Sequence, residues 1–138
     1  TMEGSPKEFD LTLISFKMVE FKQSRSSFIP LLAELAPEQR LEINDKSAKA
    51  RGIKDGDMVW VESQNAVTGE RRKVKVRARL SEGIRPDTVG MPHHYGMWTH
   101  PSTKGQGPTG NVLFFTGDGY VSNSADQSFQ VKVRVSKV

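Results

Sequence analysis

Apolar and polar residues alternate with a period of two along much of the chain, which predicts short β-strands. The clearest case is the segment 71–80, where Val74, Val76, Ala78 and Leu80 share one face and basic residues share the other. Weaker versions of the pattern predict further strands at 9–17, 40–44, 58–63, 84–91, 112–116 and 129–135. Glycine and proline interrupt the chain at short intervals, as is typical of proteins built from many short strands.

Two short segments between the predicted strands carry helix signals. The segment 28–35 follows Ser27, a candidate N-cap, and the segment 45–51 is capped by Asn44 or Asp45. Six or seven strands with two short inserted helices predict a mainly β fold, either a barrel or a sandwich. Closure into a barrel is favoured because it leaves no exposed strand edge.

Three regions lie outside this pattern. Residues 1–8 are expected to form a disordered tail or a cloning remnant, so the folded domain is expected over residues 9–138. Residues 18–27 are polar and are expected to form an ordered loop. Residues 92–111 are rich in Gly, Pro and His, and a loop of that length in a compact domain is usually functional or disordered.

Composition narrows the classes of function. The chain has 138 residues, 36% of them hydrophobic and 26% charged, which fits a single globular domain. It has no cysteine, so disulfides, thiolate zinc sites and cysteine-held iron–sulfur clusters are excluded within this sequence. No apolar run approaches the roughly 18 residues of a membrane helix.

The net charge of +4 invites a nucleic-acid interpretation. A basic stripe on one predicted strand, formed by Lys73, Lys75, Arg77 and Arg79, would be the contact surface. A solvated strand face is the simpler interpretation of this stripe, and a docking surface for other parts of a larger enzyme is a third. Few aromatic residues stand outside core positions, so the stacking platform used for single-stranded nucleic acid is not evident.

The order of motifs resembles one family. Residues 43–61 read INDKSAKARGIKDGDMVWV, in which a strand ends in Asn, a short helix follows, and Gly-Ile and Gly-Asp lead into a Val-x-Val strand. This series is similar to the C-terminal domain of the molybdopterin-dependent (dimethyl sulfoxide reductase-like) oxidoreductases. Further similar segments, in the same order as in the family, are 11–17 (LTLISFK), 23–26 (QSRS), 32–37 (LAELAP), 83–86, 95–98 (YGMW) and 110–111 (GN).

The resemblance implies a double-psi β-barrel that binds molybdopterin guanine dinucleotide carrying molybdenum or tungsten. It implies contacts with other domains of the same catalytic subunit and, as a further partner, an iron–sulfur electron-transfer subunit, with no nucleic-acid binding and no direct membrane insertion. The segments 15–17, 24–26 and 93–98 are most similar to the branch that reduces sulfur oxyanions or arsenate. The isolated domain would be inactive. A free-standing cofactor-binding subunit and, less favoured, a basic nucleic-acid-binding barrel remain as alternatives.

The same resemblance implies a set of cofactor contacts: Ser15, Lys17, Gln23, Ser24, Arg25, Asn44, Asp57, His94, Gly96, Trp98 and Asn111. Several have ordinary structural explanations. For Asn44 an N-cap role, and for Asn111 a turn role, explains the residue as well as cofactor binding does. For Asp57 a structural role in the turn is favoured over cofactor binding. For Trp98 the favoured role is to plug the mouth of the barrel.

Charge and metal chemistry refine this set. Arg25 lies between serines with no helical pattern to explain it, so phosphate neutralisation is slightly favoured there. His93, His94 and His100 lack a nearby carboxylate and a helix to set their spacing, so hydrogen bonding of His94 or His100 to the cofactor is favoured over metal ligation. A nucleotide site would require Asn44, Asn111 and Arg25 to converge at one mouth of the barrel.

Overall fold

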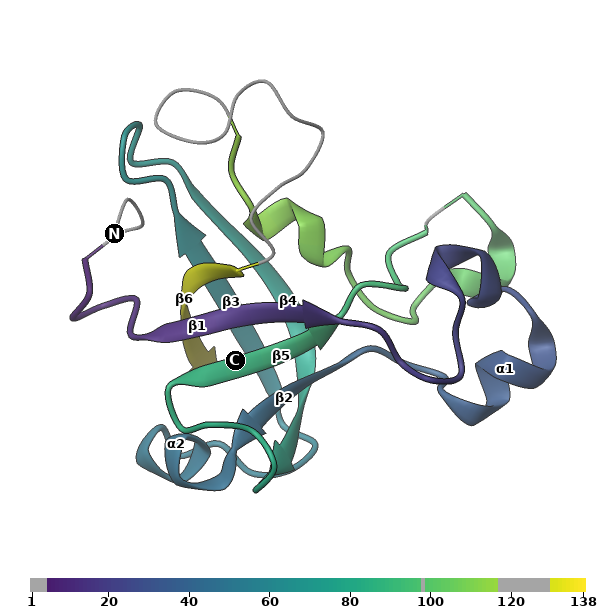
Figure 1. Cartoon of the computed structure of the whole chain (residues 1–138), viewed down its shortest axis with the longest axis horizontal. Coiled ribbons are helices and arrows are strands. Elements are labelled where there is room, and N and C mark those ends of the chain that lie inside the picture. Colours follow the sequence, from purple (N-terminus) through teal and green to yellow (C-terminus); the bar gives the residue numbers. More distant parts are fainter. Residues whose placement is uncertain (1–4, 98, 117–129) are drawn as a thin grey trace.

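The structure is a computed structural model that describes residues 5–97, 99–116 and 130–138 (Figure 1). Within these residues it contains six strands: β1 Leu11–Phe16, β2 Arg40–Asn44, β3 Met58–Gln64, β4 Arg71–Ser81, β5 Thr88–Pro92 and β6 Gln130–Lys137. Short helices lie between them: η1 Gln23–Ser26, α1 Pro30–Leu35, α2 Asp45–Ala50, η2 Pro101–Thr103 and η3 Gly110–Leu113.

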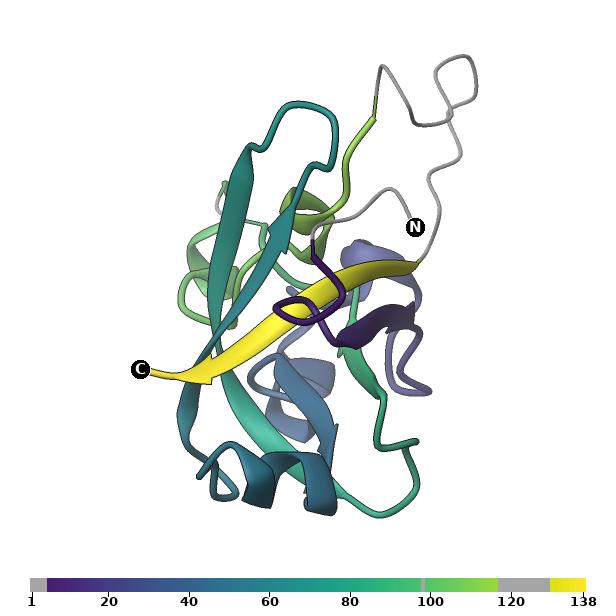
Figure 2. The same cartoon turned by 90° about the vertical axis from the view of Figure 1, so that its left-hand side faces the viewer.

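The six strands close into a barrel in the order β1-β5-β2-β4-β3-β6. The pairs β1–β5 and β2–β4 are parallel, and the four remaining pairs are antiparallel. Figure 2 shows β6 crossing the barrel wall, where it pairs with β1 on one side and β3 on the other. The predicted mainly β, double-psi barrel with short inserted helices is therefore confirmed.

The alternating apolar residues point into the barrel, as the period of two predicts. In β4, Val74, Val76 and Ala78 are buried while Lys73 and Lys75 are exposed. Inward side chains from all six strands form one continuous core, which includes Leu11, Leu13, Leu41, Ile43, Val59, Val61, Val89, Met91, Val131, Val133 and Val135. Burial of this apolar surface is the main stabilising term of the fold.

Strand directions separate the two ends of the barrel. The parallel strands β1 and β5 end side by side, with Phe16 opposite Pro92. The strand β2 runs antiparallel to β5 and ends at the opposite side, where α2 follows. We call the first side the loop end, formed by residues 17–39, 93–97 and 99–111, and the second side the α2 end, formed by residues 44–57 and 81–87. In Figure 1 the loop end carries α1 and the α2 end lies at the bottom.

The strand predicted at 112–116 is wrong. Residues Gly110–Leu113 form η3, and no strand is assigned to 114–116. The closed barrel offers no free edge to this segment, so its carbonyl groups bond to side chains instead. Ser63 Oγ donates to Leu113 O over 2.7 Å, and the Arg72 guanidinium donates to Phe114 O over 3.1 Å.

Two smaller predictions also need correction. The N-cap of α1 is Ile29 rather than Ser27, because the Ser27 hydroxyl donates to Ser24 O over 2.7 Å and closes the preceding turn. The strand predicted at 84–91 begins only at Thr88, whose N–H donates to Arg85 O in a turn. The polar loop 18–27, predicted as ordered, contains η1.

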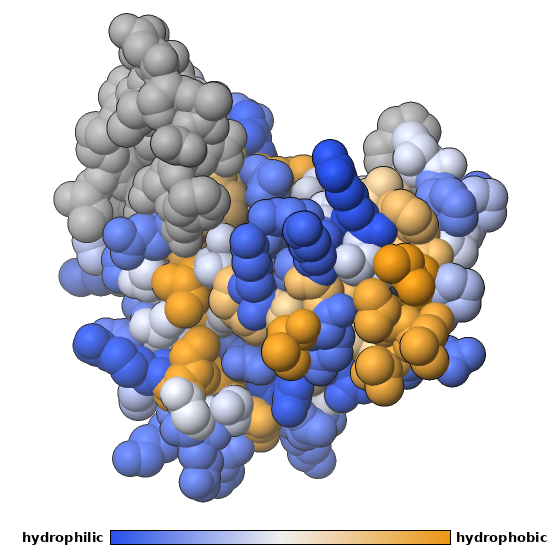
Figure 3. Space-filling view, turned by 45° about the vertical axis from the view of Figure 1, so that its right-hand side comes forward, coloured by the Kyte–Doolittle hydropathy of each residue, from blue (hydrophilic) through white to orange (hydrophobic). Residues whose placement is uncertain are grey.

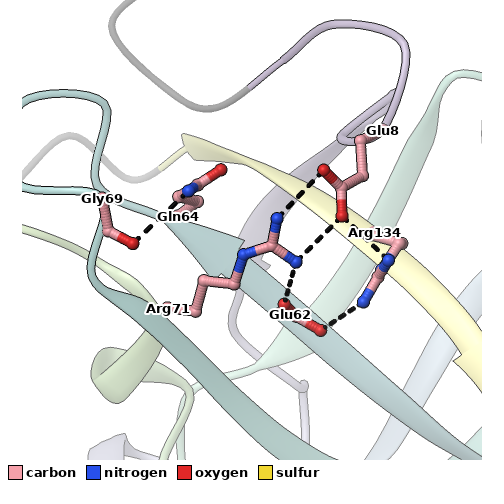
Figure 4. Close-up of polar contacts among 6 residues, drawn as sticks. All are labelled: Glu8, Glu62, Gln64, Gly69, Arg71 and Arg134. Carbon is pink, nitrogen blue, oxygen red and sulfur yellow. Dashed lines mark hydrogen bonds and ion pairs between the residues drawn. The ribbon is translucent and has the colours of Figure 1, made fainter.

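A charged cluster ties the segment before β1 to the outside of the barrel (Figure 4). Glu62 on β3 lies between Arg71 on β4 and Arg134 on β6, at 3.1 and 2.7 Å. Both guanidinium groups also contact Glu8, each at 2.9 Å. Residues 1–4 of the expected tail lie outside the described residues. Glu8 thus joins the segment before β1 to β4 and β6.

Replacing Glu62 with Gln should lower the free energy of unfolding by about 1–2 kcal/mol, because two arginines then face each other across a neutral side chain. Burial alone would raise the pKa of Glu62, but Arg134 and Arg71 outweigh it and hold the pKa below its ordinary value of 4.5. The folded state therefore favours the carboxylate. Its stabilising contribution should be complete above pH 4.5 and should be lost as the pH falls through the lowered pKa.

Urea denaturation of both proteins at neutral pH and at pH 3 to 4 would measure this difference. The gap between the parent chain and Glu62→Gln should narrow in acid. Glu70→Gln, at an exposed carboxylate paired with Arg72 alone among the described residues, is the matched control and should change the midpoint little. A gap that stays constant with pH would contradict this account of the cluster.

Candidate cofactor site at the loop end

A small apolar cluster joins the segments that leave β1 and β5. Phe21, Ala36 and Tyr95 are buried together, with Met18 and Leu32 packed against them. The Tyr95 hydroxyl donates to Ala36 O over 2.9 Å. Burial, with smaller contributions from Glu20 and Glu38, raises the pKa of Tyr95 to about 12, so the phenol stays protonated and keeps this hydrogen bond. The cluster gives the loop end a core of its own.

His94 is a fully buried part of this framework rather than an exposed side chain. It is 0% exposed, and its Nε2 accepts a hydrogen bond from Met18 N over 3.0 Å. Its ring lies 5.4 Å from that of Phe21 and 4.5 Å from that of His93, centroid to centroid. Burial lowers the pKa of His94, and the neighbouring His93 and Lys17 lower it further. A direct contact of His94 with a cofactor stays a prediction and would require the ring to be uncovered.

The adjacent residue, His93, is the histidine that faces a cavity. It lines a small hollow together with Ser15 on β1 and Asn111 on η3. Burial and the nearby charge of Lys17 lower the pKa of His93, so the neutral ring is favoured, with one nitrogen donating and the other accepting. The sequence suggests only metal ligation for His93, because its place beside Ser15 depends on the pairing of β1 with β5.

Four cations at the loop end, Lys104 among them, lack acidic partners within the described residues. Lys17, Lys22 and Arg25 are exposed, and their side chains make no ion pair or hydrogen bond with any described residue. Lys22 was missed because it carries no motif. Positive charges that are not neutralised within the protein are available to an anionic ligand.

The basic stripe on β4 differs in this respect. Arg77 contacts Glu38 at 3.2 Å and Arg79 approaches Glu42 at 3.9 Å. Lys73 Nζ lies 4.5 Å from the ring centroid of Trp60, and Lys75 Nζ lies 5.8 Å from it. Each member of the stripe thus has a partner within the chain, as expected of a strand face that is structural.

The loop that carries these cations has a strained backbone. Gln23 has φ of +58°, a left-handed conformation that is uncommon for residues other than glycine. Ser26 stabilises this turn, because its Oγ accepts from Lys22 N over 2.9 Å. Ser24 contributes its carbonyl to the Ser27 hydroxyl. The Gln23 and Arg25 side chains are left exposed at the surface of the loop end.

Buried polar atoms without partners also gather here. Among the described residues, Gln39 Oε1, Gln106 Oε1 and His94 Nδ1 are enclosed and make no hydrogen bond with another protein group. All three lie in the loop end, and Arg134 Nε in the charged cluster is the only other such atom described. Unsatisfied buried polar atoms cost free energy, so this region is the part of the fold that a bound polar group would complete.

The predicted convergence of Asn44, Asn111 and Arg25 is wrong. Asn44 caps α2 at the α2 end, where its Oδ1 accepts from Lys46 N over 2.9 Å and its Nδ2 donates to Ile84 O over 2.6 Å. Arg25 and Asn111 lie at the loop end. The antiparallel pairing of β2 with β5 causes this separation, since two asparagines that each follow an apolar segment can leave opposite ends of a barrel.

Asp57 also belongs to the α2 end. Its Oδ2 accepts from Lys54 N over 2.9 Å and contacts Lys137 Nζ at 2.8 Å. The hydrogen bond from Lys137, followed by that from the Lys54 backbone, lowers the pKa of Asp57. The carboxylate is therefore committed to the turn before β3, as its favoured structural interpretation stated.

The remaining candidates lie at the loop end or outside the described residues. Gly96 has φ of +94° and packs directly against the backbone of Thr109. His100 is exposed, with Nδ1 at 2.7 Å from Ser102 Oγ. Trp98 lies outside the described residues. Eight of the predicted site residues thus lie at the loop end or at its border: Ser15, Lys17, Gln23, Ser24, Arg25, His94, Gly96 and Asn111.

Two other kinds of feature are absent from the described residues. No group of three or more His, Cys, Asp or Glu side chains within residues 5–97, 99–116 and 130–138 is placed to hold a metal ion. None of the helices in the same residues has the length and apolar character to cross a bilayer.

Comparisons with known proteins identify the family. Residues 11–130 match the family described as "Molydopterin dinucleotide binding domain". The chain is 35% identical over 90 residues to the thiosulfate reductase molybdopterin-containing subunit PhsA of Salmonella typhimurium, covering 65% of this chain and 11% of that protein. It is 29% identical over 133 residues to the formate dehydrogenase-O major subunit of Escherichia coli, covering 94% and 13%.

The fold comparison agrees. Acetylene hydratase from Pelobacter acetylenicus superposes with a TM-score of 0.76 at 16% identity, covering 96% of this chain and 19% of that one. The chain spans about a tenth of the length of the curated relatives named above. Since the family match covers 120 of the 138 residues, this chain belongs to the molybdopterin dinucleotide-binding domain family.

Proposed function

We propose that this domain binds molybdopterin guanine dinucleotide at its loop end. The observation that carries the proposal is the contrast between Lys17, Lys22 and Arg25, which lack partners among the described residues, and the cations of the β4 stripe, which pair with Glu38 and Glu42 or lie over the Trp60 ring. A dinucleotide carries phosphates, which cations and polar loops bind well.

The residues present at the loop end fit such a group. Lys17 and Arg25 supply charge for phosphates, and His93 and Asn111 offer side-chain donors and acceptors around the hollow that Ser15 also lines. The unpartnered Gln39, Gln106 and His94 atoms are enclosed, so they support the proposal through ordered water or through rearrangement of the loop end around a bound polar group. When bound, the cofactor supplies the redox chemistry, and the domain supplies binding, orientation and electrostatics.

The parent protein is proposed to be a larger catalytic subunit that reduces a small oxyanion. Two observations support this. The matching segments make up only 11% and 13% of the two relatives named above, and one of these relatives is a thiosulfate reductase subunit. Exposed apolar side chains also gather at the loop end, at Val19, Ile29, Leu31 and Leu35. Orange surface on the right of Figure 3 shows apolar atoms collected on this side of the molecule. Such a patch fits contact with further domains of the same subunit.

An iron–sulfur electron-transfer subunit as a further partner, and tungsten in place of molybdenum, stay predictions from the resemblance. The free-standing subunit is less favoured, because the relatives named above carry the matching region within a much longer chain. Nucleic-acid binding is less favoured because the basic stripe is paired within the domain.

Guanosine diphosphate tests the site directly, since it presents the guanine and the phosphates of the cofactor. Titration of the ¹⁵N-labelled 138-residue chain should shift amide signals of residues 15–26, 93–96 and 110–111. Charge reversal by Lys17→Glu together with Arg25→Glu should weaken binding at least about tenfold, because two attractive contacts become repulsive.

Lys73→Glu together with Lys75→Glu is the matched control. It makes the same change in net charge at the basic stripe and should weaken binding only through long-range, salt-screened attraction. Shifts that map to the stripe, or equal losses in the two double variants, would refute the loop-end site. A steep salt dependence of oligonucleotide binding would favour the nucleic-acid alternative.

A further inference from the structure

The hydrogen bond between Met18 and His94 joins two loops that leave neighbouring strands. Met18 follows β1, His94 follows β5, and the two residues are 76 positions apart. The Met18 N–H donates to Nε2, so Nε2 must carry a free lone pair. The neutral ring is then protonated on Nδ1. A doubly protonated ring would lose the acceptor and place a second N–H against the Met18 N–H.

His94 is also enclosed by positively charged and apolar neighbours. The His93 ring lies against the His94 ring at a tilt of 38°, Phe21 packs against it, and Lys17 contributes a repulsive positive charge. The backbone of Gln23 favours a proton on the ring and partly opposes the lowered pKa, yet Nδ1 reaches no described group with hydrogen-bond geometry. Glu20 and Glu38 act on the pKa of Tyr95, whereas no acidic group among the described residues shifts the pKa of His94.

The loop held by this bond is the one that carries three cations without acidic partners among the described residues. Residues 17–25 include Lys17, Lys22 and Arg25, and the strained Gln23 lies in the same segment. A strained residue persists only where its surroundings fix it. The Met18–His94 bond fixes one side of this loop, and the bond from Lys22 N to Ser26 fixes the other.

We propose that neutral His94 is a positioning residue that locks the cation-bearing loop 17–25, and that protonation of His94 at mildly acidic pH releases it. The locking step stands on the geometry of this chain alone, whereas its consequence for ligand binding rests on the proposed function. The expected effect of protonation on anion binding is opposite to the effect of the added charge alone. Protonation adds positive charge, which alone would strengthen anion binding, but release of the loop scatters the cations and weakens it.

Hydrogen exchange of the 138-residue chain between pH 8 and pH 5 tests the lock. Protection of the Met18 amide, corrected for the intrinsic exchange rate at each pH, should fall by up to about tenfold per pH unit below the ordinary histidine range, because opening is coupled to uptake of one proton. Protection in β6 should stay constant, which separates local release from global unfolding.

Two variants make the test specific. His94→Gln keeps a side-chain oxygen that can accept from Met18 and cannot titrate, so the pH dependence should disappear. His93→Gln removes the neighbouring histidine ring, and this variant should retain the pH dependence. Imidazole ¹⁵N shifts of the parent chain report the tautomer without any substitution. A flat profile in the parent chain, a slope that survives His94→Gln, or a His94 ring protonated on Nε2 at pH 8 would each overturn the proposal.

Sulfate binding separates this inference from the proposed function, because the charge of sulfate does not change over this range. Parent-chain affinity should fall between pH 8 and pH 5, whereas that of His94→Gln should be unchanged or rise. An affinity that rises in the parent chain would contradict release of the loop. A chain that binds no sulfate at pH 8 would count against the loop-end site, and the exchange profile would still decide the lock.

Discussion

Gly96→Ala is expected to lower the free energy of unfolding by more than about 3 kcal/mol, or to leave the loop end unfolded. An added Cβ would lie 2.5 Å from both the backbone N and the Cβ of Thr109, and 2.6 Å from its Cα. Backbone atoms cannot move aside as the end of a flexible side chain can. The φ of +94° adds strain for any residue with a Cβ.

Gly105→Ala is the matched control for this substitution. Gly105 also has positive φ, at +83°, but an added Cβ would meet no atom within 4 Å. Its cost should be limited to backbone strain, about 1 kcal/mol. Chemical denaturation of the three proteins measures both values. Equal losses would mean that the Gly96–Thr109 approach does not restrict the loop, and that Gly96 is required for its φ alone.

The contact with Thr109 gives Gly96, a predicted cofactor contact, a structural role instead. Gly96 lets the segment after β5 pass directly over the segment before η3, which brings His93 and Asn111 to one hollow. Its effect on ligand binding would therefore be indirect. Gly96→Ala should reduce guanosine diphosphate binding together with stability, whereas Lys17→Glu with Arg25→Glu should reduce binding while leaving the core intact.

The barrel could be predicted because its signal is local. Inward positions such as Val74, Val76 and Val133 alternate within single strands, and that period depends only on backbone geometry. Segments where side chains satisfy the backbone were predicted less well. Residues 112–116 looked like a strand, but the Ser63 hydroxyl and the Arg72 guanidinium take carbonyl groups there that a neighbouring strand would otherwise bond.

The site was harder to predict than the fold, because its properties arise from pairing between distant segments. Sequence cannot show that Arg77 has Glu38 beside it while Arg25 has no described partner. Nor can it show which of two adjacent histidines is enclosed, since His93 and His94 differ in burial only after β1 has paired with β5. The order of motifs in the sequence correctly grouped most residues of the loop end. Only the directions of the strands show that Asn44 lies at the opposite end of the barrel.

Asn44→Ala is expected to lower the free energy of unfolding by about 2–3 kcal/mol. Loss of the N-cap costs about 1 kcal/mol, and the Ile84 carbonyl, left without its donor, adds about 1–2 kcal/mol. Both hydrogen bonds are present in the structure, and Asn44 is only 7% exposed. Because α2 is six residues long, loss of its cap should also reduce protection of amides throughout residues 45–50.

Asn44→Asp separates the contribution of the N-cap from that of the hydrogen bond to Ile84 O. A carboxylate still accepts from Lys46 N and suits the first turn of a helix, but it cannot donate to Ile84 O. The cap is kept, but a carboxylate oxygen then faces the Ile84 carbonyl oxygen, so the loss of stability at neutral pH should come from that contact alone and should shrink in acid, where the protonated carboxyl can donate. Guanosine diphosphate should bind both variants as it binds the parent chain, since Asn44 lies at the α2 end. If folded Asn44→Ala no longer shifts the signals of residues 15–26, then Asn44 belongs to the nucleotide site, and the assignment of that site to the loop end is wrong.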